Sequence, residues 1–257
     1  MPAAAIPSPA PELSIVIPAF NEEQRLPRTL AELQRALGRY GGEVEVLVVD
    51  DGSSDATAAT VRAFRASFPL RVLANPGNRG KGYSVRHGML AARGRYLLFT
   101  DADLSAPIGE LAKLRAALDA GADIAIGSRA EAELIQAHQS RVRESAGRFF
   151  NRLVVLTLGL PFRDTQCGFK LFRQEAAARI FPLQRIEGWG FDPELLFLAK
   201  LQGWKVQEVP VVWAHAPGAK IRLLRDSGRM FADLVRIRWY ALRGGYRQAA
   251  ARDSAVA

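Results

Sequence analysis

The stretch Arg95–Asp103 reads RYLLFTDAD, a short apolar run that ends directly in two carboxylates. A continuous apolar run of this length is typical of a strand buried on both faces of a parallel sheet. Similar runs precede it, LSIVIP at 13–18, EVEVLVVD at 43–50 and LRVLA at 70–74, and ADIAIG follows at 122–127. Helical patterns lie between the runs. The sequence therefore predicts βαβ units and an α/β fold, with a Rossmann-like, mostly parallel sheet flanked by helices.

The helices are expected where apolar residues recur at helical spacing. In the amino-terminal half we expect a helix from about Asn21 to Gly38, one that Ser54 or Asp55 caps and that runs through Phe68, one at 82–92 and one that Pro107 opens. In the rest of the chain we expect helices at 140–160 and 193–202, strands at 169–172 and 206–212, and a final amphipathic helix at 223–242.

The composition excludes several classes of protein. Of the 257 residues, 49% are hydrophobic, which is enough for a sizeable core. The single cysteine, Cys167, excludes a disulfide framework and a cysteine-based metal cage, and we expect it to be a buried small side chain. The three histidines lie far apart, and no apolar run approaches the roughly 18 residues that a membrane span needs.

The charge is unevenly distributed. The formal net charge is +9, and the stretch from Ala219 to the end holds nine Lys or Arg and three Asp, so +6 of the charge lies there. A basic, aromatic-containing segment indicates an anionic partner such as phospholipid, a phosphate-bearing substrate or nucleic acid. The alternative is a solvated helix with a basic outer face.

Polar clusters follow the predicted strands, at the edge where ligands bind in open parallel sheets. Asp101 and Asp103 come directly after one strand, and hard cations such as Mg²⁺ and Mn²⁺ prefer such oxygen ligands. Asp50 and Asp51 follow another strand, where their carboxylates could accept hydrogen bonds from a base or a ribose. The sequence at 78–82 (NRGKG) precedes a helix, where its lysine and the helix amino terminus favour phosphate.

These clusters together resemble family 2 nucleotide-sugar glycosyltransferases, which have the GT-A fold. The motifs that carry the resemblance are Pro18-Ala-Phe-Asn21-Glu22, Asp50-Asp51-Gly-Ser, Asn78-x-Gly80-Lys81-Gly82 and Asp101-Ala-Asp103. The carboxyl-terminal half is similar to the dolichyl-phosphate β-glucosyltransferases through Gly127-Ser128-Arg129, RDTQCGFKLF at 163–172, WGFDPELL at 189–196 and Gly218-Ala-Lys220. Dolichyl-phosphate mannose synthases are a sister group.

The resemblance implies a role for each matching residue. Pro18, Glu22, Asp50 and Asp51 would hold the uridine, Lys81 would stand near the nucleotide, and Asp101 and Asp103 would bind Mg²⁺ or Mn²⁺ at the diphosphate. Ser105 stands where the mannose synthases have a glutamine that completes the metal shell. Arg129, Arg143, Asp164, Gln166 and Lys220 would bind the acceptor, with ordinary pairing to Glu131, Glu133 or Glu144 as the alternative for the arginines. Asp192 would act as a base or orient sugar hydroxyls, or it could equally cap a helix that begins at Pro193.

The resemblance also implies a domain plan. We expect flexible tails at 1–11 and 247–257 and one domain at 12–246, with a nucleotide-sugar half (12–128), an acceptor half (129–218) and a basic amphipathic membrane-surface segment (219–246). The eukaryotic glucosyl enzymes carry an amino-terminal membrane anchor that this sequence does not show. The terminal segment is therefore expected to hold the chain peripherally on an anionic membrane surface, on the cytoplasmic face.

The implied reaction is metal-dependent, inverting transfer of glucose from UDP-glucose to a polyprenyl phosphate. Alternatives within the class are mannosyl transfer from GDP-mannose and transfer to a soluble alcohol. Alternatives outside it are a basic nucleic-acid-binding module and a non-catalytic nucleotide-sugar sensor. No recognisable nucleic-acid motif is present, and the basic residues stand beside apolar ones, so no nucleic acid is expected as a partner.

Overall fold

The computed structural model describes residues 10–137, 141–214 and 223–246. The strands are β1 (Leu13–Ala19), β2 (Val44–Asp50), β3 (Leu70–Ala74), β4 (Tyr96–Thr100), β5 (Ile124–Ser128), β6 (Ile135–Ala137), β7 (Phe169–Arg173), β8 (Val206–Pro210) and β9 (Trp213–Ala214). The helices are α1 (Leu26–Leu37), α2 (Thr57–Ala63), α3 (Lys81–Ala91), α4 (Leu111–Asp119), α5 (Arg141–Leu158), α6 (Gln174–Ile180), α7 (Phe191–Leu201) and α8 (Leu223–Leu242).

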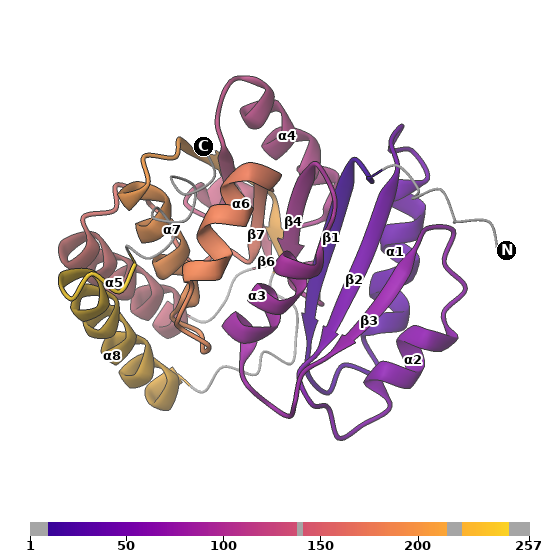
Figure 1. Cartoon of the computed structure of the whole chain (residues 1–257), viewed down its shortest axis with the longest axis horizontal. Coiled ribbons are helices and arrows are strands. Elements are labelled where there is room, and N and C mark those ends of the chain that lie inside the picture. Colours follow the sequence, from indigo (N-terminus) through magenta and orange to yellow (C-terminus); the bar gives the residue numbers. More distant parts are fainter. Residues whose placement is uncertain (1–9, 138–140, 215–222, 247–257) are drawn as a thin grey trace, which may run out of the picture.

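Seven of the strands form one sheet in the order β3-β2-β1-β4-β7-β5-β8, and β6 pairs with β9 in a small second sheet (Figure 1). All neighbours in the large sheet are parallel except β7, which is antiparallel to both β4 and β5. This arrangement confirms the predicted α/β fold with a mostly parallel sheet.

Both faces of the sheet are covered by helices, as the continuous apolar runs predict. Along β1, Ile15 and Ile17 pack into a core that contains the apolar residues of α1 and α4, whereas Val16 points to the other face. That second core is built with residues of α3, α5, α6, α7 and α8. No helix in the described ranges combines the length and the apolar composition that crossing a bilayer requires.

The structure differs from the local expectations in two respects, the end of α2 and three short elements that were not expected. Helix α2 ends at Ala63 because Phe64 has extended backbone angles, so it does not run to Phe68. Its N-cap position is Ala56, but Oδ1 of Asp55 accepts a hydrogen bond from the N–H of Thr57 (3.0 Å), so the expected capping by Asp55 is confirmed. The short helix α6 and the pair β6–β9 were not expected, because segments of two to seven residues are too short to show a period.

Antiparallel β7 determines what meets at one edge of the sheet. The carboxyl ends of β1, β2, β3, β4, β5 and β8 lie at the same edge, and β7 brings its amino end there, with Phe169 opposite Thr100. We call this side of the sheet the carboxyl edge. The loops that follow the parallel strands and the loop that precedes β7 are therefore neighbours, although they are distant in the sequence.

The contact between α3 and the sheet requires a residue without a side chain. A Cβ on Gly88 would lie 2.3 Å from Cγ1 of Val16 and 2.8 Å from Cγ2 of Val49. We expect Gly88→Ala to lower the free energy of unfolding by about 1–3 kcal/mol, because overpacking displaces α3. Gly228→Ala on α8 is the matched control, since no atom lies within 4 Å of its Cβ position.

The measurement is urea denaturation of both variants. The control should be unchanged or gain up to about 1 kcal/mol from the better helix propensity of alanine. Equal behaviour of the two variants would contradict the close approach of α3 to the sheet.

Candidate functional site

The loop between β3 and α3 is held by Asp51, which is 4% exposed. Its Oδ1 accepts hydrogen bonds from Asn75 Nδ2 (2.7 Å) and the backbone N–H of Arg79 (2.9 Å), and its Oδ2 accepts one from the N–H of Gly80 (2.8 Å). Three donors therefore surround this carboxylate. Asp51 shapes the loop from inside, and any contact of this residue with a nucleotide remains a prediction.

Asp50 lies at the end of β2, where its Oδ1 accepts a hydrogen bond from the backbone N–H of Ser53 (3.1 Å). Gly52 between them has φ +71, and a Cβ there would lie 2.5 Å from the carbonyl carbon of Gly77. The expected tight turn is thus present, and it packs directly on the loop that Asp51 holds.

The turn after β1 completes this part of the edge. Pro18 is half-buried within β1, and Asn21 has the left-handed φ of 52 and accepts a hydrogen bond from the N–H of Ser54 (2.8 Å). Glu22 forms an ion pair with Arg25 (2.8 Å). The four residues expected to hold a nucleoside thus come from the ends of β1 and β2, which are adjacent strands.

Lys81 and Asp101 form the central ion pair of the edge. Nζ of Lys81, at the start of α3, lies 2.5 Å from Oδ1 of Asp101, which follows β4. The Lys81 side chain is 12% exposed and lies over the rings of Trp189 (5.3 Å) and Phe191 (5.9 Å). Burial pulls the pKa of Lys81 down, but the carboxylates of Asp101 and Asp192 outweigh it and raise that pKa above its usual value.

Asp101 touches the loop before β7 as closely as it touches α3. A Cβ on Gly168 would lie 2.2 Å from Oδ2 of Asp101. Asp103, two residues further on, is half-buried and accepts a hydrogen bond from the N–H of Ser105 (2.9 Å), across Leu104 with its left-handed φ of 47. The turn thus keeps both carboxylates at the carboxyl edge.

These two carboxylates fit a divalent cation as part of a ligand set. Oxygen donors suit Mg²⁺ and Mn²⁺, and such ions commonly bridge one or two carboxylates to substrate phosphates. Within the described residues no group of three or more His, Cys, Asp or Glu could hold a metal by itself. Asp101 and Asp103 could therefore hold a cation together with phosphate oxygens. Without a cation, Lys81 balances the negative charge of Asp101.

A buried ion pair lies beneath this site. Lys170 on β7 is fully buried, and its Nζ donates to Oδ1 of Asp192 and to the carbonyl oxygen of Cys167 (2.6 Å). Burial raises the pKa of Asp192, although Lys170 and Lys81 act in the opposite direction. Helix α7 starts at Phe191 with Gly190 as its N-cap residue, so the expectation of Asp192 as a possible helix cap was wrong.

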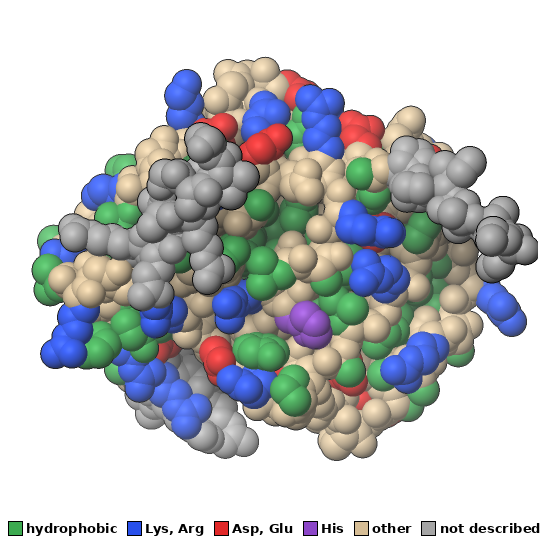
Figure 2. All heavy atoms as spheres, viewed as in Figure 1, with side chains coloured by type: hydrophobic (Ala, Val, Ile, Leu, Met, Phe, Trp, Pro, Cys, Tyr) green, Lys and Arg blue, Asp and Glu red, His purple; other side chains and the backbone are tan. Residues whose placement is uncertain are grey.

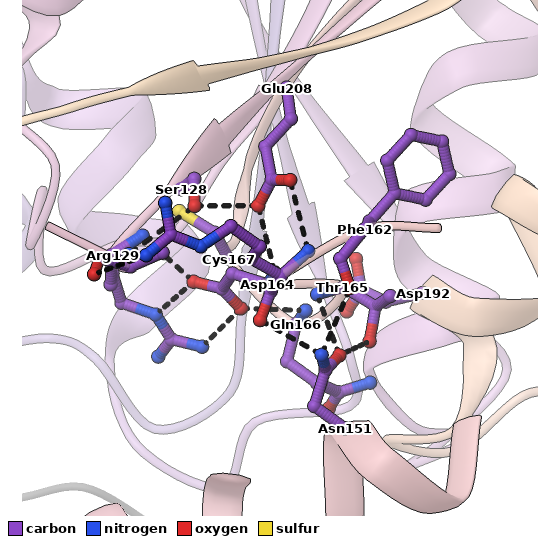
Figure 3. Close-up of polar contacts among 12 residues, drawn as sticks. Ser128, Arg129, Asn151, Phe162, Asp164, Thr165, Gln166, Cys167, Asp192 and Glu208 are labelled. Carbon is purple, nitrogen blue, oxygen red and sulfur yellow. Dashed lines mark hydrogen bonds and ion pairs between the residues drawn. The ribbon is translucent and has the colours of Figure 1, made fainter. Parts of the chain in front are cut away.

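The loop 162–168 before β7 is tied to three elements (Figure 3). Arg129, after β5, makes two parallel hydrogen bonds to Asp164, from Nε to Oδ2 (2.7 Å) and from Nη2 to Oδ1 (2.8 Å). Glu208 on β8 accepts from the N–H of Asp164 (2.8 Å), and Asn151 on α5 accepts from Oγ1 of Thr165 (2.9 Å). The loop is therefore rigidly placed against the carboxyl edge.

The Arg129–Asp164 pair stays ionised near neutral pH. Burial alone would raise the pKa of Asp164, but the Arg129 guanidinium outweighs this effect and lowers that pKa to about 2. Arg129 thus pairs with Asp164, and not with Glu131 or Glu133, which the alternative interpretation of the sequence gave as its partners. Gln166 donates its backbone N–H to Asp164 (3.1 Å), and its side-chain Nε2 is buried without a partner in the structure.

Some expectations fall on parts that the structure does not describe. Lys220 and the tails at 1–9 and 247–257 lie outside the described residues, and Arg143 is placed on α5 without a described side chain. Cys167 is 2% exposed, and burial raises the pKa of its thiol to about 12, which confirms a buried, non-nucleophilic cysteine.

The sequence reasoning missed two buried charged residues. Lys170 is a lone lysine in the apolar run FKLF, and a charge in a central strand is a signal for a buried partner. Glu194, in the first turn of α7, is fully buried and accepts from the N–H groups of Arg185 and Ile186 and from the Tyr246 hydroxyl (2.6 Å). Glu194 thus connects the loop 185–190 with Tyr246, which comes shortly after α8 in the sequence.

The sequence has close relatives. The profile of Glycosyl transferase family 2 matches residues 14–181. A dolichyl-phosphate β-glucosyltransferase of Drosophila melanogaster is 41% identical over 255 residues, which cover 93% of this chain and 78% of that protein. The proteins of that name from Saccharomyces cerevisiae and Homo sapiens are 38% and 36% identical, over 91% and 93% of this chain and 76% and 79% of their own lengths.

Solved structures show the same fold. Glucosyl-3-phosphoglycerate synthase from Mycobacterium tuberculosis, in complex with Mn²⁺, UDP and glucosyl-3-phosphoglycerate, matches 88% of this chain and 78% of that chain, with a TM-score of 0.65 and 22% identity. Structures of that enzyme with Mn²⁺, UDP-glucose and phosphoglyceric acid, and with Mg²⁺ and UDP, give TM-scores of 0.65 and 0.64 at 21% and 22% identity. They confirm the GT-A arrangement of the sheet.

Glu194 makes a pH dependence of stability testable. Burial raises its pKa from 4.5 to about 7, so the folded chain keeps a proton that the unfolded chain releases. This contribution is present below the unfolded value and is lost as the pH rises through 7. We expect Glu194→Gln to flatten the decline in the free energy of unfolding between about pH 5 and 7.5, by up to about 3 kcal/mol.

Denaturation at several pH values measures this slope, whatever the absolute stability of the variant. Glu131→Gln, at an exposed position, is the control and should keep the wild-type slope. Parallel curves for wild type and Glu194→Gln would show that Glu194 is ionised in the folded chain throughout this range.

Proposed function

This chain belongs to glycosyl transferase family 2 and is a hexosyltransferase, and from that premise we propose that it transfers glucose from UDP-glucose to a polyprenyl phosphate of the dolichyl type. The observation that carries the proposal is the placement of Asp101 and Asp103 at the carboxyl end of β4, next to Lys81. The relatives named dolichyl-phosphate β-glucosyltransferase match almost the whole chain, which supports the donor sugar and the lipid acceptor.

The nucleoside end of the donor is proposed to lie over the ends of β1 and β2. Pro18 and Asp50 would border the base, with Glu22 nearby and Asp51 acting through the loop that it holds. The diphosphate would then reach Lys81 at the amino terminus of α3, where backbone N–H groups and the helix dipole favour an anion.

Asp101 and Asp103 would hold Mg²⁺ or Mn²⁺ against the diphosphate. When bound, the cation supplies Lewis-acid stabilisation of the leaving UDP. Lys81 adds a fixed positive charge beside Asp101, and its raised pKa keeps it charged at neutral pH. The protein thus places its cationic groups where negative charge develops during the reaction.

The acceptor phosphate is the proposed nucleophile. One of its oxygens forms a bond to the anomeric carbon from the side opposite UDP, and the bond from that carbon to the diphosphate breaks with its electron pair on UDP. The α-linked donor therefore gives a β-linked product. A phosphate is already anionic near neutral pH and needs little help from a base, so we assign Asp192 to positioning Lys81 and Lys170 instead.

The acceptor half is proposed to bring the lipid phosphate to this point. Arg129 and Arg143 remain candidates for phosphate contacts, and Asp164 and Gln166 remain candidates for sugar contacts. The ion pair of Arg129 with Asp164 gives both residues a second role, because it fixes the loop 162–168 beside Asp101. No role for Lys220 is argued from geometry, since it lies outside the described ranges.

Helices α5 and α8 lie side by side and form the proposed membrane surface (Figure 1). Their exposed apolar side chains are Phe149, Val155 and Leu156 on α5 and Phe231, Val235, Trp239 and Leu242 on α8. Exposed arginines alternate with them, among them Arg238 on α8 and Arg243 directly after it, and basic and apolar side chains are mixed at this end of the molecule (Figure 2). This mixture is typical of helices that lie on anionic bilayers.

The donor and metal assignment has a direct test. Asp103→Ala should lower the rate of metal-dependent glucose transfer by about two orders of magnitude, because a ligand of the cation at the leaving diphosphate is lost. Asp119→Ala, at an exposed position of α4, is the matched control and should keep the wild-type rate. The assay uses UDP-glucose, a short polyprenyl phosphate and Mg²⁺ or Mn²⁺, with GDP-mannose as the competing donor.

Faster transfer from GDP-mannose than from UDP-glucose would replace the proposed donor. A normal rate for Asp103→Ala at saturating metal would remove Asp103 from the cation site.

The membrane surface is tested by sedimentation with vesicles. The chain should bind anionic vesicles at low salt and leave them at high salt, because each basic residue near such a surface contributes about 1 kcal/mol. Arg238→Glu/Arg243→Glu should weaken this binding while transfer to a soluble acceptor stays unchanged. Equal binding to neutral and anionic vesicles would contradict electrostatic docking.

A further inference from the structure

A cavity of about 530 Å³ lies between three segments: the turn 78–81 before α3, the loop 185–189, and one face of α8. Its volume is within the range of small-molecule sites. Lys81 lines it, and this residue is also the partner of Asp101. The cavity therefore opens directly beside the position that we propose for the donor diphosphate.

The wall of this cavity is basic. Five of its lining residues carry positive charge (Arg79, Lys81, Arg185, Arg229 and Arg236), and two carry negative charge (Glu187 and Asp233). The acidic residues are already paired, Glu187 with Arg79 (2.6 Å) and Asp233 with Arg236 (3.1 Å). An anion that enters would thus meet an excess of positive charge.

The other lining residues are Asn78, two glycines and four apolar or aromatic residues, Ile186, Trp189, Met230 and Tyr240. On α8, Phe231 and Trp239 are exposed next to these positions in the sequence, on the surface proposed to face the membrane. The cavity is thus basic with an apolar part, and exposed apolar side chains lie on the same helix, α8. This combination suits a ligand with an anionic head and an apolar tail.

The cavity keeps its shape without a ligand, because hydrogen bonds connect its walls to each other. Glu194 holds the N–H groups of Arg185 and Ile186 and the hydroxyl of Tyr246, and Arg185 Nη2 donates to the carbonyl oxygen of Gly245 (2.7 Å). A Cβ on Gly190 would lie 2.6 Å from Oδ2 of Asp233, so α8 also contacts the loop directly.

We propose that this cavity is the binding site for the phosphate head of the lipid acceptor, with Arg229 and Arg236 of α8 as its cationic contacts. The inference rests on the proposed function for the identity of the ligand. In this proposal α8 has two roles: one of its faces lies on the membrane, and the other binds the phosphate of the membrane lipid. The apolar tail would follow the exposed side chains of α8 toward the bilayer.

The geometry also explains why Arg129 alone is a weak candidate for this task. Its guanidinium already makes two hydrogen bonds to Asp164, whose carboxylate stays ionised. A phosphate bound there would lie beside that negative charge, which costs free energy. In the cavity Arg236 is also paired, with Asp233, but there the acidic groups are outnumbered by the basic ones.

The test compares two double variants in the segment 229–243 with farnesyl phosphate as a soluble acceptor, in the absence of membranes. Arg229→Gln/Arg236→Gln removes two charges from the cavity wall, and Arg238→Gln/Arg243→Gln removes two exposed charges that do not line it. We expect the KM for farnesyl phosphate to rise about tenfold or more in the first variant, as for the loss of charge-assisted hydrogen bonds. The second variant should match the wild type, and both should keep the wild-type KM for UDP-glucose.

Calorimetric titration of farnesyl phosphate without donor gives a second readout that does not need turnover. Binding should weaken in the first variant only, and farnesol, which lacks the phosphate, should not bind at the same concentration. If the wild type binds farnesyl phosphate in this way but transfers no glucose, the proposed function fails and the cavity assignment stands.

Three results would overturn the cavity assignment. The first is unchanged binding and KM in Arg229→Gln/Arg236→Gln. The second is an equal loss of UDP binding in that variant, which would place the donor diphosphate in the cavity. The third is loss of farnesyl phosphate binding only in Arg129→Gln/Asp164→Asn, which removes the pair together and so leaves no buried charge unpaired.

Discussion

Strand β7 is bonded to β4 on one side and to β5 on the other, in the opposite direction to both. Much of the arrangement at the carboxyl edge follows from this reversal. It brings Gly168 against Asp101, and it places Lys170 inside the molecule, where Asp192 and the carbonyl oxygen of Cys167 balance its charge. A parallel strand in this position would send its preceding loop to the far edge of the sheet, away from the cation site.

The charges along this edge alternate. Lys170 contacts Asp192, and the charges of Asp192 and Asp101 both act on Lys81, which pairs directly with Asp101. Each buried charge is thus offset by an opposite one, and removing one member would leave its neighbour uncompensated in a poorly solvated place. The carboxylates at the outer end of this row of charges, Asp101 and Asp103, are partly exposed. A cation and a diphosphate could bind next to them and continue the alternation of charges.

The parts of the fold that were predictable are those with a local signal. The runs LSIVIP and EVEVLVVD identified buried strands, and the positions of Asp50 and Asp101 at strand ends placed them at one edge. The direction of β7 has no local signal, because FKLF reads as a buried strand in either direction. The lone charge of Lys170 was a signal for a buried partner, but which residue pairs with it depends on the packing of α7 against β7, so its bond to Asp192 was missed. The first turn of α7 was placed too late, since its start at Phe191 depends on the packing of the loop 185–190.

Tyr246 closes the polypeptide onto its own interior, since its hydroxyl is a donor to the buried Glu194. This contact sets a practical boundary for anyone who shortens the protein to obtain crystals or to improve expression. A version that stops before Tyr246 would leave the Glu194 carboxyl with backbone donors alone. One that also lacks Gly245 would lose the carbonyl oxygen that accepts from Arg185. Trimming from the carboxyl terminus should therefore stop after Tyr246, even though this residue lies far along the sequence from the motifs at the carboxyl edge.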